Sequence, residues 1–258
     1  MDWRTIKSIF IIVFLLLNVF LIRLFLSKMY NEHLIVVQTE TLEEQLVDDD
    51  ITLPEELPEE DEFKYMITGD RRVFDDDDFA FVEGKVISYN LDRTSATVTL
   101  YMPYEIPVSN NINDLKQFME DYVPDGKKYR FTSFEEEERR YVFYQVHDEK
   151  ALYGNSNARV FIYVNEVGQI ISYSQSMLVD IHEFGSAQKL IPAIKAIESL
   201  YRMVGIVSGS ELTKVELGYF SLFPEIPYQV LEPSWLIEID SKERYYVTGF
   251  EGRVFEIE

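Results

Sequence analysis

The longest apolar run of the chain lies at its N-terminus. It extends from Ile9 to Ile22 and is interrupted only by Asn18. A helix of these 14 residues is short for a hydrocarbon core of about 30 Å, but four further residues, three of them apolar, bring the run to 18. The pattern predicts a helix over residues 6–28, with a membrane-spanning part at residues 9–28.

Basic residues flank this run on both sides and predict its orientation. Arg4 and Lys7 precede it, and Arg23 and Lys28 follow it. The charge difference is small, but almost no chain precedes Arg4, so a cytoplasmic N-terminus requires little translocation. We expect residues 31–258 outside the cytoplasm, with the Arg23 side chain extending to the membrane interface.

A cleaved signal peptide is the alternative for this segment. Signal peptidase needs small residues just after the apolar core, yet residues 23–68 contain neither Ala nor Gly. The chain has no Cys, which excludes a lipoprotein anchor. These features favour a helix that the protein retains.

Residues 29–62 predict a stem followed by an acidic linker. Four stem positions follow one another at spacings of 4, 3 and 4, as on one face of a short helix: Ile35, Thr39, Leu42 and Leu46. A frayed extension of the first helix fits equally well. Residues 40–62 hold twelve acidic residues and no basic one, which is typical of a solvated linker. Calcium binding is the alternative for this run and for Asp75–Asp78. Neither run has the loop pattern, with a distal Glu, that folds ligands around one calcium ion.

From Phe63 onward the pattern is mostly that of strands. Runs rich in Val, Ile, Tyr and Thr predict hairpins that turn at residues 92–94, at Glu135–Arg140 and at Asn165–Gly168, and further strands at residues 214–223, 234–240 and 244–258. Glu135 to Glu138, beside Arg139 and Arg140, form a charged bend in this interpretation. With 46 acidic residues in the chain, some pair of carboxylates is expected by chance to lie as close as the catalytic pair of a glycosidase, so such a pair would not by itself indicate an enzyme.

Two helices interrupt the strands. The first covers residues 112–122, ends before Pro124, and places five residues on one face: Ile112, Leu115, Phe118, Met119 and Tyr122. The second covers residues 186–206, capped by Ser186 and closed by Gly205, with Pro192 as a kink.

These elements predict an α+β domain of antiparallel sheets with a few helices, after the cytoplasmic residues 1–8 and the membrane helix. Residues 161–173 and 245–257 share a strand, a Gly-containing turn and a second strand, each downstream of a helix. This similarity predicts two related α+β modules, at residues 63–183 and 184–258. Independent hairpins with similar turns would look the same.

Charge and composition narrow the function. The net charge is −22, and residues 31–258 hold 45 acidic against 20 basic residues, which argues against nucleic acid and anionic lipid surfaces as partners. Without Cys, an exported domain must be held together by packing alone.

Catalytic and metal-binding motifs are missing from the sequence. The three histidines, His33, His147 and His182, have no spacing that shares a metal, and no nucleophile elbow or phosphate-binding glycine loop occurs. We expect no catalytic residue, no metal and no cofactor. Seven strand tyrosines are expected mainly in the core, with a binding face as the alternative: Tyr141, Tyr144, Tyr153, Tyr163, Tyr173, Tyr245 and Tyr246.

Several segments, taken in order, resemble the YycI (WalI) family. They are "MDW" with Lys7 and "IFIIVFLLLNVFLI", then "ITLPEELP", "YVFYQVHDEKALYGNSNARVFIYVNEVGQIISYSQ", "AIESLY", "LGYF" and "VLEPSW". The resemblance covers nearly all of the chain, although the acidic stretch at residues 55–62 is heavier than the family pattern. It implies a membrane-anchored, non-catalytic accessory protein of the WalK/YycG sensor histidine kinase that acts with YycH. Members of the family differ in whether they restrain or activate the kinase.

Asn18 is the candidate contact residue of the N-terminal helix. An amide in hydrocarbon needs a hydrogen-bond partner, and Asn commonly finds one on a neighbouring helix. Helical spacing places six large residues around the same side: Ile11, Phe14, Leu15, Leu21, Ile22 and Phe25. In the alternative, Asn18 bonds to a carbonyl of its own helix and faces lipid.

Three functions follow from the sequence, in descending order of preference. The first is a regulatory subunit that acts through packing of the membrane helix. The second is an extracytoplasmic sensor that binds a cell-envelope fragment in a pocket between the two modules. The third is an enzyme acting on the wall.

Overall fold

The structure is a computed structural model that describes residues 3–33, 42–106, 112–221 and 229–256. It divides into two compact units, Met1–Asp49 and Asp50–Glu258.

The first unit contains two helices, α1 at Trp3–His33 and α2 at Leu42–Asp48. Helix α1 includes the helix predicted at residues 6–28. Within the described residues, however, no helix combines the length and apolar character needed to cross a membrane. The membrane-spanning part at residues 9–28 stays a prediction. Of the predicted stem positions, Ile35 and Thr39 lie outside the described residues.

The second unit is built mainly of strands. Its α-helices are α3 (Ile112–Tyr122) and α4 (Ala193–Met203), and two short 3-10 helices cover Asp77–Phe79 and Gly126–Lys128. The strands are β1 (Phe63–Arg71), β2 (Lys85–Tyr89), β3 (Ser95–Tyr104), β4 (Tyr129–Glu135), β5 (Arg140–His147), β6 (Lys150–Tyr153), β7 (Arg159–Val164), β8 (Ile170–Ser176), β9 (Leu178–Lys189), β10 (Leu212–Phe220), β11 (Gln229–Ile239), β12 (Glu243–Thr248) and β13 (Val254–Glu256).

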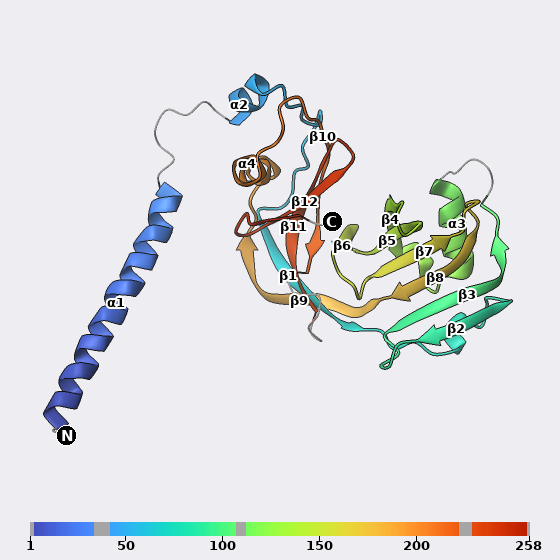
Figure 1. The fold of residues 1–258 in the computed structure, drawn as a ribbon, viewed down its shortest axis with the longest axis horizontal. Coiled ribbons are helices and arrows are strands. Elements are labelled where there is room, and N and C mark those ends of the chain that lie inside the picture. The colour runs from blue at the N-terminus through green and yellow to red at the C-terminus, as the bar shows by residue number, and fades with distance from the viewer. Residues whose placement is uncertain (1–2, 34–41, 107–111, 222–228, 257–258) are drawn as a thin grey trace. The chain divides into compact units, whose positions relative to one another are not determined.

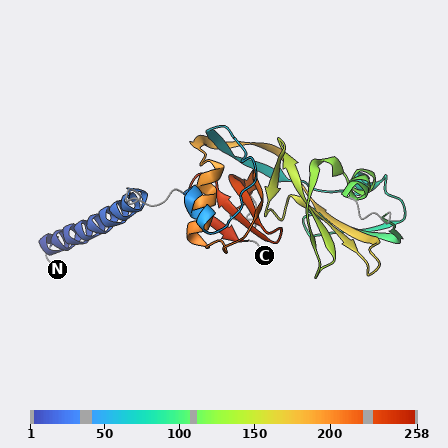
Figure 2. The ribbon, with the colours of Figure 1, turned by 90° about the horizontal axis from the view of Figure 1, so that it is seen from above.

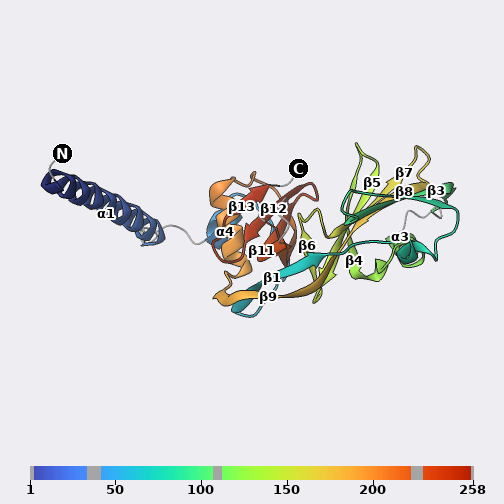
Figure 3. The same ribbon diagram turned by 90° about the horizontal axis from the view of Figure 1, so that it is seen from below.

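These strands form one mixed, mostly antiparallel sheet system (Figure 1). Its main order is β13-β12-β11-β10-β6-β5-β7-β8-β3-β2, in which β6 and β10 pair in parallel. Strand β4 pairs with β5, and β1 pairs with both β9 and β11. Figure 3 shows β3, β5, β7 and β8 with α3 toward one end and β11 to β13 with α4 toward the other. The predicted α+β class is confirmed.

Each of the two longer helices of this unit covers part of the sheet. Leu115, Phe118 and Met119 of α3 are buried in a core with strand residues, and the Phe118 ring lies 6.0 Å from that of Tyr173 in an edge-on contact. Helix α4 lies against the C-terminal strands (Figure 2), where the Trp235 indole N–H donates to the Ile191 carbonyl at 2.9 Å. The predicted helix at residues 112–122 is confirmed. Of its predicted face, Leu115, Phe118 and Met119 are buried and Tyr122 is half-buried, while the side chain of Ile112 lies outside the described residues. The division into modules at residues 63–183 and 184–258 stays a prediction.

The predicted helix at residues 186–206 starts too early. Residues up to Lys189 belong to β9, which pairs with β1 along Phe63–Arg71, and α4 begins only after Pro192. Pro192, predicted as a kink, occupies the N-cap position of α4 and lies outside the helix, where a proline removes no helical hydrogen bond and clashes with no preceding turn. Ser186, predicted as the cap, lies in β9. Gly205, with a φ of +79°, closes this helix region as predicted.

The predicted hairpins form at their predicted turns. Between β7 and β8, the Asn165 side-chain carbonyl accepts hydrogen bonds from the backbone N–H groups of Val167 at 3.1 Å and Gln169 at 2.9 Å. Gly168 adopts the left-handed φ of +82° that this turn requires. The charged bend at Glu135–Arg140 is the β4–β5 turn, closed by an ion pair between these two side chains.

The acidic segment before β1 is partly held against the domain. The backbone of Thr52 bonds to Ser210 and Leu212, and the Glu60 carboxylate pairs with Lys64 at 3.1 Å and Lys150 at 2.7 Å. These contacts make residues 52–62 part of the folded unit, whereas the sequence predicts a solvated linker.

Candidate functional site

The predicted contact residues of α1 are exposed where the structure describes them. Ile11, Phe14, Leu15, Leu21 and Ile22 all have more than half of their surface exposed, while the side chain of Phe25 lies outside the described residues. Residues on the other faces of the helix, such as Phe10 and Leu16, are equally exposed. Burial therefore does not single out one face, and the interface stays a prediction.

Asn18 forms a hydrogen bond within its own helix. Its side-chain N–H donates to the Phe14 carbonyl at 2.8 Å, four residues earlier. This is the contact that the alternative interpretation predicts. Because an amide has two N–H donors and an acceptor oxygen, the bond leaves further capacity for a neighbouring helix.

The predicted membrane-boundary residues are described in part. The Lys7 ammonium lies over the Trp3 ring, 5.4 Å from its centroid, and Arg23 is exposed. The side chains of Arg4 and Lys28 lie outside the described residues.

In the second unit, the acidic run Asp75–Asp78 binds its own backbone. The Asp75 carboxylate accepts from the N–H groups of Asp77 at 3.0 Å and Asp78 at 3.2 Å, and Asp78 accepts from the Asp75 N–H at 2.9 Å. Asp76 accepts hydrogen bonds from Tyr89 and Arg93. Among the described residues, no group of three or more His, Cys, Asp or Glu is placed to hold a metal ion.

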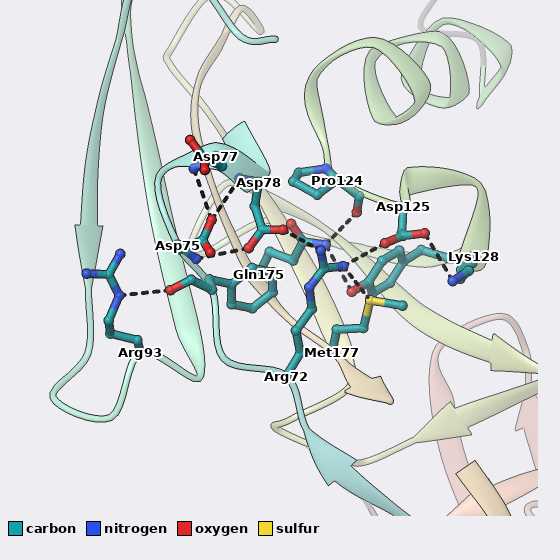
Figure 4. A network of polar contacts seen from close by, with 12 residues as sticks. Arg72, Asp75, Asp77, Asp78, Arg93, Pro124, Asp125, Lys128, Gln175 and Met177 are labelled. Carbon is teal, nitrogen blue, oxygen red and sulfur yellow. Dashed lines mark hydrogen bonds and ion pairs between the residues drawn. The ribbon is translucent and has the colours of Figure 1, made fainter. Parts of the chain in front are cut away.

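Arg72, just after β1, is the centre of a polar network in this unit (Figure 4). Its guanidinium donates to Asp78 at 2.5 Å and to Asp125 at 2.6 Å, and its backbone N–H donates to the Met177 carbonyl at 2.9 Å. One guanidinium N–H also points to the Met177 sulfur at 3.4 Å. Arg72 thus ties together the first 3-10 turn, the start of the second and the junction of β8 and β9.

Buried groups extend this network beneath Asp125. The Gln175 amide donates to the Pro124 carbonyl at 2.7 Å and to the Tyr129 hydroxyl at 3.2 Å, and that hydroxyl donates to the Ser176 carbonyl at 2.8 Å. Asp125 also pairs with Lys128 at 3.0 Å. These contacts hold the turn after α3 against β8.

The ionisation of this network follows from its contacts. Burial by itself lowers the pKa of the Arg72 guanidinium, but its hydrogen bonds to Asp125 and Asp78 outweigh burial and raise the pKa above its ordinary value. Burial by itself raises the pKa of the Asp125 carboxyl, but the bonds from Lys128 and Arg72 leave it lowered. Both pKa shifts favour the charged forms of Arg72 and Asp125, so this ion pair serves as a structural brace.

No motif in the sequence predicts this brace. Arg72 and Asp125 are 53 residues apart, and neither belongs to a periodic pattern.

The strand tyrosines lie largely where the sequence predicts. Tyr153, Tyr173 and Tyr246 are buried, as the core interpretation predicts, whereas Tyr141 and Tyr144 are half-buried.

Comparison with known proteins assigns a family. A family model described as "YycI protein" matches residues 31–250. The chain belongs to the YycI family. The match begins near the end of α1, so family membership rests on the residues that follow the apolar run.

No curated protein matches the chain. Solved structures similar to it include YycH from Bacillus subtilis, at 15% identity and a TM-score of 0.40, covering 67% of this chain and 41% of that one. An uncharacterized protein from Eubacterium rectale ATCC 33656 has 12% identity and a TM-score of 0.44, covering 82% of this chain and 92% of that one. The YpeB C-terminal domain from Bacillus megaterium has 13% identity and a TM-score of 0.39, covering 67% and 82%.

Proposed function

We propose that this YycI-family protein is a non-catalytic regulatory subunit of a WalK/YycG-type sensor histidine kinase and acts together with a YycH-like membrane protein. The observation that carries the proposal is the family match over residues 31–250. The sequence adds that no motif for catalysis or metal binding is present.

In this proposal the N-terminal helix is a retained membrane anchor, with a cytoplasmic N-terminus and residues 31–258 outside. The support is the continuous exposure of large apolar side chains on α1, of which those from Phe10 to Leu17 are each 50% or more exposed. Such a surface requires a lipid or protein environment. Cysteine labelling from outside intact cells should modify residues placed after position 31 and leave position 2 unlabelled, and the reverse pattern would refute this orientation.

Contact with the kinase is assigned to one side of α1. The residues are Asn18 and its neighbours Ile11, Phe14, Leu15, Leu21, Ile22 and Phe25, and the support is their helical spacing around a single polar group. The two modules at residues 63–183 and 184–258 would set the position of this helix from outside.

Replacement of the anchor tests the proposal. Full-length protein should co-purify with the kinase, and exchanging residues 1–30 for an unrelated membrane anchor should abolish the association while the outer domain stays folded. Unchanged association after the exchange would contradict a role for α1. In-cell crosslinking from positions 9–26 should identify the partner by mass.

The second candidate function is a sensor for a cell-envelope fragment. One observation favours it: a cavity of about 330 Å³ is lined by residues from both predicted modules, between positions 132 and 161 and between positions 241 and 246. A thermal-shift screen of the full-length protein against envelope fragments tests it, and the absence of any stabilisation would count against a sensor.

A further inference from the structure

The cavity just described is basic, and we call it the basic cavity. Its walls come from β4, β5, β7, the β11–β12 turn and β12. Four lining side chains are cations and one is a carboxylate: Arg140, Arg159, Lys242, Arg244 and Glu135.

This local concentration of positive charge contrasts with the chain as a whole, which carries a net charge of −22. The contrast is local as well. A second cavity of about 450 Å³ is lined by Glu59, Glu60, Asp61 and Glu62, with Lys189 as a cationic neighbour. Cations gathered in a hollow repel one another unless something negative balances them.

Half of this charge is balanced within the protein. Arg140 pairs with Glu135, and the Arg244 guanidinium pairs with Glu238 at 2.9 Å. Arg159 and Lys242 take part in no ion pair among the residues that the structure describes, whereas most other described cations of this unit do. About two positive charges therefore remain for a ligand.

Two of the guanidinium groups are held in place by an aromatic ring. The central guanidinium carbon of Arg140 lies 3.9 Å from the centroid of the Phe161 ring, and that of Arg159 lies 4.4 Å from it. Phe161 itself is buried, so the ring is a fixed platform. A stacked guanidinium directs its N–H groups outward along its edge. The Arg140 Nε–H donates to Glu135, and the remaining edge N–H groups of the two guanidiniums can bind an oxyanion in a fixed geometry.

Lys242 is placed at the cavity by the β11–β12 turn. Asp240 and Ser241 adopt left-handed φ angles of 52° and 56°, which tighten this turn. Arg244, two residues further, reaches across and donates to the Thr132 carbonyl of β4 at 3.4 Å. The two sides of the cavity are therefore joined, and the cations come from segments that are far apart in the sequence.

We propose that the basic cavity binds a phosphate monoester group. The two unbalanced cations match the charge of about −1.5 to −2 that such a group carries at pH 7, and they exceed the single charge of a carboxylate. Arg159 and Arg140 bind its oxygens through their guanidinium edges, and Lys242 supplies a further charge from the rim. This inference rests on the sensor alternative, to which it adds a ligand class, and it is independent of the kinase contact assigned to α1.

Binding of glycerol 3-phosphate to the full-length protein in non-ionic detergent tests the proposal by calorimetry. The double variant Arg159→Gln/Lys242→Gln should bind at least about tenfold more weakly, because each charge-assisted hydrogen bond is worth at least about this factor. The control Lys116→Gln/Lys127→Gln removes the same charge from the exposed region of α3 and the turn after it, and should bind like the parent. Acetate at equal ionic strength should bind far more weakly.

Thermal unfolding without ligand shows whether the double variant is folded. If it is not, Lys242→Gln alone serves, because Lys242 is exposed and its loss removes no core contact, and weaker binding is again expected. The proposal is overturned if the parent binds neither glycerol 3-phosphate nor inorganic phosphate, if the folded variant binds as tightly as the parent, or if acetate binds equally well.

Proteoliposomes distinguish the two sources of the phosphate. If phosphatidic acid in phosphatidylcholine vesicles competes with glycerol 3-phosphate, the ligand is a lipid headgroup, and if it does not, the ligand is a soluble phosphate. Both results support the site. Stabilisation by an envelope fragment that lacks phosphate, together with no phosphate binding, would overturn this inference and leave the sensor alternative standing.

Discussion

The side-chain amide of Gln145 binds both backbone polar groups of Leu178, as a neighbouring strand would. Its amide N–H donates to the Leu178 carbonyl at 2.7 Å, and its carbonyl accepts from the Leu178 N–H at 2.8 Å. Both residues are almost completely buried, at 3% and 1% exposure. The bonds fasten the first residue of β9 to β5, at the point where the chain leaves β8.

We expect Gln145→Leu to destabilise the outer domain by about 2–4 kcal/mol. The change leaves a buried N–H and a buried carbonyl of Leu178 without partners, and each such loss costs about 1–3 kcal/mol. Chemical denaturation gives the free energy of unfolding. The matched control is Gln117→Leu, in which the amide lost is exposed and donates to Asp121, and its effect should stay within about 0.5 kcal/mol. Equal effects of the two changes would contradict the strand-replacing role.

Arg72→Gln should also destabilise the domain, by about 1–3 kcal/mol. The Arg72 side chain is 21% exposed, and its removal leaves the partly buried Asp78 and Asp125 carboxylates without their shared cation. Arg253→Gln is the comparison, because its pair with Glu251 is more than half exposed and should contribute at most about 1 kcal/mol. If both changes had the same small effect, Arg72 would not be a brace.

The Asp125 carboxyl should contribute to acid sensitivity. The pKa of this carboxyl is lower in the folded protein than in the unfolded chain, where it is about 3.9. Its contribution to the free energy of unfolding is therefore fully present above the unfolded pKa and is lost as the pH falls through the folded pKa. The parent should therefore lose stability more steeply below about pH 4 than Asp125→Asn does. Denaturation measured at a series of pH values checks this, and parallel profiles would contradict it.

Asn18→Leu should weaken association with the kinase or the YycH-like partner. An interhelical hydrogen bond of Asn is worth about 0.6–2 kcal/mol, which corresponds to a loss of about threefold to thirtyfold in affinity. The bond from Asn18 to the Phe14 carbonyl is dispensable for the helix, because that carbonyl is part of the α1 backbone ladder. Quantitative co-purification and kinase output are the measurements.

Phe10→Leu and Leu16→Ile are the controls for Asn18. Both positions are exposed on α1 and lie on other faces, so these changes should have smaller effects. If Asn18→Leu co-purifies with its partners like the parent and signalling is unaltered, Asn18 faces lipid, as the alternative interpretation predicts.

The sequence by itself determined the elements whose causes are local. Helix α3 follows from apolar residues at helical spacing, of which Leu115, Phe118 and Met119 are buried. The β7–β8 hairpin follows from Asn165 and Gly168, because both partners of the Asn165 side chain lie within four residues. The apolar period and the turn hydrogen bonds involve residues close together in the chain, so both signals can be read along the sequence.

Only the tertiary structure decided where β9 ends and how its neighbours are braced. Residues from Ser186 to Lys189 have the local signals of a helix start, yet pairing with β1 keeps the chain extended there. Arg72 finds Asp125 across 53 residues, and Gln145 finds Leu178 across 33. A side-chain hydrogen bond acts over about 3 Å and leaves no period in the sequence, so its partner is known only once the path of the chain brings the two groups together.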